Sequence, residues 1–107
     1  MNIQISNRHE SANNNAKSFI ESELATLQGK YDILGADVIL DREGHAIVQY
    51  SAEINLKVKG STLHAKESSS DINKSIDLVV KTLEKQLKKH KETTYASQEL
   101  RRKAGEK

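Results

Sequence analysis

The sequence predicts an α+β domain with the order β-α-β-β-β-α, in which a four-stranded sheet carries both helices on one face. Two segments repeat apolar residues at helical spacing. Other segments alternate apolar and polar residues as half-buried strands do. The length of 107 residues accommodates one small domain. Because each helix and the best strand have a single apolar face, two packed layers bury all of it.

The chain begins with a short strand and a helix. Ile3 and Ile5 alternate with polar residues, which is the period of a strand. The polar stretch 11–15 contains Ser and Asn, whose side chains cap helix N-termini, so we expect the helix to begin there. Its apolar stripe consists of Ala16, Phe19, Ile20, Leu24 and Leu27. Gly29 follows the stripe and predicts the end of the helix.

Three further strands follow. The β-branched run Val38–Leu40 ends in a turn composition at Asp41–Gly44. Residues Tyr50–Val58 alternate strictly between apolar and polar side chains, and the turn Gly60-Ser61 leads to a second alternating run at Leu63–Ala65. We expect these strands to form an antiparallel meander. The first strand pairs parallel with the second, because the helix between them acts as a right-handed crossover.

A second helix is predicted from about Asp71 to about Lys91. Ser and Asp residues at 68–71 precede it, as is typical of helix caps. Its apolar stripe consists of Ile72, Ile76, Val79, Val80, Leu83 and Leu87. Residues 92–107 contain few large apolar groups and are predicted to be a frayed helical extension or a disordered tail. We therefore divide the chain into one domain, residues 1–91, and a flexible basic tail, residues 92–107.

Several classes of function are excluded by what the sequence lacks. The absence of cysteine rules out disulfides, thiolate catalysis and iron–sulfur ligation. The four histidines, His9, His45, His64 and His90, have no zinc-site spacing, and no phosphate loop or nucleophile elbow is present. No apolar run approaches the ~18 residues of a membrane span, and the N-terminus lacks a signal pattern. We expect a non-enzymatic, cytoplasmic protein without cofactor, metal, membrane contact or small-molecule substrate.

Charge is distributed unevenly along the chain. Residues 1–73 hold 7 Lys/Arg and 10 Asp/Glu, a net charge of −3, whereas residues 74–107 hold 10 Lys/Arg and 5 Asp/Glu, a net charge of +5. This asymmetry favours a polyanionic partner, although lysine-rich terminal helices also occur without one.

The second helix carries six of the ten Lys/Arg residues found in 74–107. Its lysines are Lys74, Lys81, Lys85, Lys88, Lys89 and Lys91, and the tail adds Arg101, Arg102 and Lys103. At 100° per residue, Lys74, Lys81, Lys85 and Lys88 share a flank beside the apolar stripe. One or two cations would suffice to complement the helix dipole, so the row indicates phosphate contacts. Aromatic residues make up only 4% of the chain, which favours folded RNA over base stacking on single strands.

One tract of the sequence resembles a known family. It comprises Leu63-His64-Ala65, Asp71, Ile76-Asp77 and Leu83–Lys91, and it resembles the ribosome hibernation-promoting factors, which include ribosome-associated inhibitor A. The resemblance implies a fold similar to a double-stranded-RNA-binding domain. It also implies binding to ribosomal RNA in the decoding channel of the small ribosomal subunit and of the intact ribosome. There the protein would occlude messenger and transfer RNA and keep idle ribosomes silent and intact.

The family pattern is matched residue by residue in part. Lys85, Lys89 and Lys91 match its basic positions, and Asp77 and Gln86 match its polar ones. Departures are Asn73 in place of an aromatic residue, Thr82 in place of a lysine, and Glu23 and Thr26 in place of basic residues on the first helix. These departures weaken the charge that would face RNA.

The length resembles that of short family members, without the additional C-terminal domain that implies ribosome dimerisation. Such a form would need a separate ribosome modulation factor to pair ribosomes, or would oppose pairing if its tail blocked that factor. The tail is basic, unlike the acidic end of inhibitor A, so both roles stay open.

Two other functions compete with this interpretation. In the first, the basic helix docks on an acidic protein such as a transcription factor. In the second, the chain binds any double-stranded RNA. A phosphate-binding site should lose affinity steeply with salt, which distinguishes it from protein docking. A ribosomal factor should prefer assembled small subunits to free duplexes.

Overall fold

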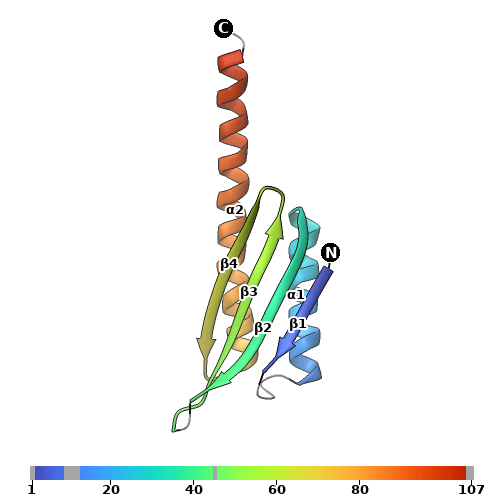
Figure 1. The fold of residues 1–107 in the computed structure, drawn as a ribbon, viewed down its shortest axis with the longest axis vertical. Coiled ribbons are helices and arrows are strands. Elements are labelled where there is room, and N and C mark those ends of the chain that lie inside the picture. The colour runs from blue at the N-terminus through green and yellow to red at the C-terminus, as the bar shows by residue number, and fades with distance from the viewer. Residues whose placement is uncertain (1, 9–12, 45, 106–107) are drawn as a thin grey trace.

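Both helices cover one face of a four-stranded sheet (Figure 1). The computed structural model describes the backbone of residues 2–8, 13–44 and 46–105, and the side chains as far as residue 90. The elements are β1 (Asn2–Asn7), α1 (Asn14–Lys30), β2 (Ile33–Glu43), β3 (Gln49–Val58), β4 (Ser61–Ser69) and α2 (Ile72–Gly105). The predicted α+β class, element order and two-layer arrangement are confirmed.

The strand order is β1-β2-β3-β4, so β1 and β4 form the two edges of the sheet. β1 pairs parallel with β2, with Ile5 opposite Val38, and α1 is the crossover between them. The pairs β2–β3 and β3–β4 are antiparallel, as the predicted meander requires. The topology places α2 beneath β3 and the edge strand β4 (Figure 1).

The core lies between the helices and the inner face of the sheet. The stripes predicted for the two helices supply its helical half, with Phe19 and Ile72 packed half-buried at its margin. The strands supply alternate residues, so that Val38, Ile54 and Leu56 are buried. Each side chain of this size contributes about 1.5–3 kcal/mol on full burial. This packing fixes which side of each helix is left to solvent.

Backbone and side-chain hydrogen bonds fix both ends of α1. Asn13 is the N-cap, and its side-chain oxygen accepts a hydrogen bond from the Ala16 N–H at 2.9 Å. Gly29 lies inside the last turn, so the predicted stop is early: the helix ends at Lys30, where the Tyr31 N–H bonds to the Leu27 carbonyl.

Three elements, β2, β4 and α2, are longer than predicted; β4 covers Ser61–Ser69 and not only Leu63–Ala65. β2 starts at Ile33, because a bulge between Ile33 and Gly35 interrupts the register without ending the strand. α2 continues past Lys91 to Gly105, since that stretch consists mostly of residues compatible with a helix and contains no proline. The outer half of α2 extends beyond the sheet (Figure 1). Throughout the described part of the chain, no helix has the length and apolar character needed to span a membrane.

Candidate nucleic-acid interface

The exposed face of α2 carries a row of lysines. Lys74, Lys81, Lys85, Lys88 and Lys89 are all solvent-exposed. At 100° per residue, the first four lie within a sector of about 60°, as predicted. Because Ile76, Val79 and Leu83 are fully buried on the other side, this sector lies opposite the apolar stripe and not beside it. We call these five residues the lysine row.

Most of the lysine row keeps its charge available for a partner. The Lys81 ammonium lies 3.0 Å from the Asp77 carboxylate, one turn earlier in the same helix. No other member of the row is joined by an ion pair among the residues with described side chains. Among the residues with described side chains, Lys74, Lys85, Lys88 and Lys89 therefore have no ion-pair partner and are exposed to solvent.

The length of the row suits a polyanionic strand. With a helical rise of ~1.5 Å per residue, Lys74 and Lys88 lie about 21 Å apart along the axis. A nucleic-acid duplex carries a negative charge every ~1.7 Å of its axis, so this span faces several phosphates at once. The row can therefore bind a backbone by counterion release, with no base contact required.

The first helix, α1, has no comparable row of lysines. On α1 the cations are Lys17 and Lys30, and the Lys30 ammonium is 3.9 Å from the Glu84 carboxylate of α2. Glu21 and Glu23 lie on the same helix. The departures noted at Glu23 and Thr26 thus leave α1 without a lysine row of its own.

The N-terminal turn of α2 is fixed to the sheet by a serine that the sequence analysis missed. Ser75 is fully buried, and its hydroxyl donates to the Tyr50 carbonyl of β3 at 2.6 Å. The Ser69 hydroxyl of β4 lies 2.7 Å from it. In the sequence, Ser75 is one of several polar residues at the start of the helix. Its position in the first turn, three residues after Ile72, was the only sign that it contacts the sheet.

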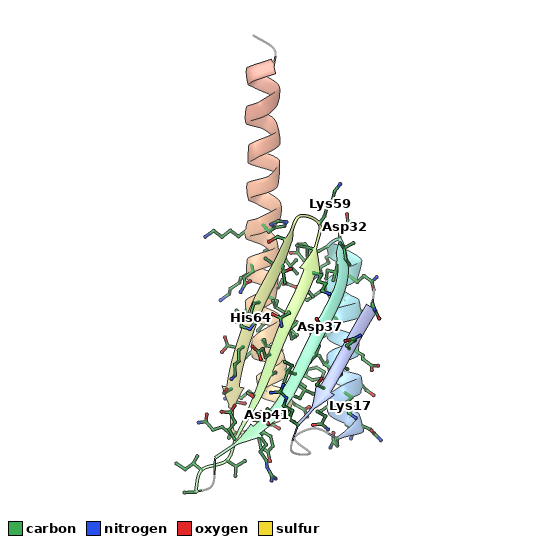
Figure 2. The ribbon with its side chains drawn as sticks, in the orientation of Figure 1. Lys17, Asp32, Asp37, Asp41, Lys59 and His64 are labelled. Carbon is green, nitrogen blue, oxygen red and sulfur yellow. The ribbon has the colours of Figure 1, made fainter. Side chains whose placement is uncertain are left out.

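The face of the sheet turned away from the helices is polar. His64 is exposed there, as predicted, and its imidazole Nε2 lies 2.7 Å from the Glu53 carboxylate of the neighbouring strand. Figure 2 shows His64 and Asp37 on this face, away from α2. A shallow hollow of about 230 Å³ lies beside Asp37 and Lys57. The hollow is remote from the lysine row.

The structure does not place every residue of the predicted site. The side chains of Lys91, Arg101, Arg102 and Lys103 lie outside the described residues, as do His9 and His45. Within the described part of the chain, no three His, Cys, Asp or Glu side chains are grouped as metal ligands would be.

Comparison with known proteins identifies relatives over nearly the whole domain. The family model described as Sigma 54 modulation protein / S30EA ribosomal protein matches residues 3–94. Two curated proteins of Pseudomonas putida, each called ribosome hibernation promoting factor, are 29% identical over 93 residues, which is 86% of this chain and 88% of theirs.

Solved structures with the same fold are also found. A ribosomal subunit interface protein from Coxiella burnetii has a TM-score of 0.69 and 25% identity, covering 85% of this chain and 98% of its own. The N-terminal domain of Thermus thermophilus Protein Y has a TM-score of 0.72 and 27% identity, covering 84% of this chain and 99% of its own.

Proposed function

We propose that this chain, which belongs to the Sigma 54 modulation protein / S30EA ribosomal protein family, is a ribosome-binding translation inhibitor of the hibernation-factor type. The lysine row carries the proposal. This chain is a relative of ribosome hibernation promoting factors, and its lysine row is a surface suited to binding ribosomal RNA. The fold shared with a ribosomal subunit interface protein supports the same partner.

The mechanism we propose is steric occlusion in the decoding channel of the small ribosomal subunit. Lys74, Lys81, Lys85, Lys88, Lys89 and Lys91 contact phosphates of ribosomal RNA, and Arg101, Arg102 and Lys103 add contacts from the end of α2. The molecule measures 64 × 25 × 16 Å, so its narrow body suits a channel that otherwise holds messenger and transfer RNA. Occupancy alone would silence the ribosome, with no catalysis and no cofactor.

Residues 1–91 would act as the ribosome-binding domain and residues 92–107 as an appended basic segment. The protein would work in the cytoplasm, where ribosomes translate. A separate ribosome modulation factor is a further partner under this proposal.

Charge reversal within the lysine row tests the proposal. The variant Lys85→Glu/Lys89→Glu should lose ribosome binding by about a hundredfold or more, because two phosphate contacts become repulsions. Equilibrium binding to purified ribosomes measures the loss, and circular dichroism checks that the fold is kept.

The matched control is Lys17→Glu/Lys57→Glu, which changes the net charge equally but lies on α1 and on the outer face of the sheet. It should bind within about threefold of wild type, since long-range charge effects are screened by salt. Equal losses in both variants would mean that net charge, and not the lysine row, governs binding.

A further inference from the structure

We infer that Gln86 is a positioning residue that fastens α2 to the edge strand β4 and thereby sets the direction of the lysine row. The inference rests on the proposed function for its effect on ribosome binding. The contact itself stands on geometry, so it can be tested without the ribosome.

Besides Ser75, two further side chains of α2 form hydrogen bonds with β4, and these two lie one turn apart. The Gln86 amide Nε2 donates to the backbone carbonyl of His64 at 3.0 Å. The Thr82 hydroxyl donates to the Glu67 carboxylate at 3.1 Å, and it also lies 3.0 Å from the Leu78 carbonyl of its own helix. β4 is an edge strand with β3 as its only strand partner in the sheet, so this helix side chain provides a partner for an edge carbonyl.

The acceptor strand is itself held firmly at this point. His64 lies opposite Asn55 in the β3–β4 ladder, and its imidazole lies 2.7 Å from the Glu53 carboxylate on the outer face. The residue is thus held by β3 on one side and by Gln86 on the other. A donor fixed to such a residue has little freedom to move.

Gln86 acts where the core ceases to hold the helix. Among the residues of α2 with described side chains, Leu87 is the last one in the buried core, and Lys88 and Lys89 follow it directly. Ile76, Val79 and Leu83 hold the earlier turns whether or not Gln86 is bonded. Among the residues with described side chains, losing this hydrogen bond would leave Leu87 as the core anchor of the turn that carries Lys85, Lys88 and Lys89. That turn would then gain freedom to rotate and bend, while the domain stays folded.

Two variants of Gln86 test separately whether ribosome binding needs the length of this side chain and its hydrogen-bond donor. Gln86→Met keeps the length and removes the donor, whereas Gln86→Asn keeps the donor and is too short to reach. Both should weaken ribosome binding by about threefold to tenfold, the size of one neutral hydrogen bond. The salt dependence should also become shallower by about one phosphate contact. Denaturant unfolding should shift little, because the core is untouched.

Gln28→Met is the matched control, since Gln28 is exposed on α1. It should bind ribosomes as wild type does. Wild-type affinity and salt dependence in Gln86→Met would overturn the inference. So would a loss of affinity with unchanged salt dependence and an equal loss of stability, which is what a merely structural role produces.

A second measurement does not depend on the ribosome. The chain has no cysteine, so Thr62→Cys on β4 and Lys88→Cys on α2 can be spin-labelled specifically. The distance distribution between the labels should be narrow with Gln86 and clearly broader with Gln86→Met. Identical distributions would refute the positioning role. Broadening in a protein that does not bind ribosomes would refute the proposed function and leave the contact standing.

Discussion

Single residues decide how α2 is attached and how much of its charge is free. Ser75 joins the helix to β3, Gln86 joins it to β4, and Asp77 neutralises one lysine of the row. The Asp77–Lys81 pair is readable from the sequence, because residues four apart lie on one helix face. The partners of Ser75 and Gln86 are not, because each is a backbone carbonyl brought near by packing between distant segments.

Ser75→Ala should destabilise the domain by about 1–3 kcal/mol, because it leaves the Tyr50 carbonyl without this buried donor. Urea unfolding measures the change in free energy. Ser18→Ala, at an exposed position of α1, should stay within about 0.5 kcal/mol of wild type. Unchanged unfolding in Ser75→Ala would contradict the structural role assigned to this hydroxyl.

Asp77→Asn should strengthen ribosome binding and steepen its salt dependence, because the Lys81 ammonium loses its carboxylate partner. Stability should fall by no more than about 0.5 kcal/mol, since the pair is solvent-exposed. Asp32→Asn changes the net charge equally, and Asp32 lies in the connection after α1 (Figure 2). If both variants bind ribosomes more tightly by the same factor, the increase in affinity does not come from Lys81.

A helix or strand could be predicted from the sequence as far as the regular spacing of its apolar residues continues without interruption. The apolar stripes predict which side of each helix faces the core, and the buried side chains confirm this prediction. β2 was predicted only at Val38–Leu40, because Gly35 and Asp37 break its apolar run while the ladder continues through them. The continuation of α2 past Lys91 is one of the two alternatives that the sequence left open, because no strong stop signal precedes Gly105.

Truncation after Lys91 should leave the free energy of unfolding within about 0.5 kcal/mol of the full chain, because Leu87 is the last core residue of α2 among those with described side chains. Ribosome affinity should fall and its salt dependence should become shallower, since Arg101, Arg102 and Lys103 are removed. Leu87→Ala in the same background is the comparison, with an expected cost of about 2–5 kcal/mol. A large loss of stability on truncation would show that the domain boundary is misplaced.

At the scale of the whole molecule, the residues that stabilise the fold and the lysines proposed to bind RNA lie on different surfaces. The sheet and the inner sides of the helices form the core, while the outer face of α2 is left to solvent with its lysines. The sequence analysis predicted this division, because the apolar stripe and the lysines occupy different sectors of one helix. Only their relative angle was misjudged: at 100° per residue, the lysines lie opposite the apolar stripe and not beside it.

Co-sedimentation with purified ribosomes and separated subunits across a salt series, with free duplex RNA as competitor, tests the central claim most directly. We predict saturable, one-to-one binding to the small subunit and the intact ribosome that resists the competitor. Affinity should fall with salt at a logarithmic slope of about −4 to −8, as six to nine phosphate contacts require. Protein that stays in the supernatant at low salt, or that the duplex displaces completely, would contradict the account.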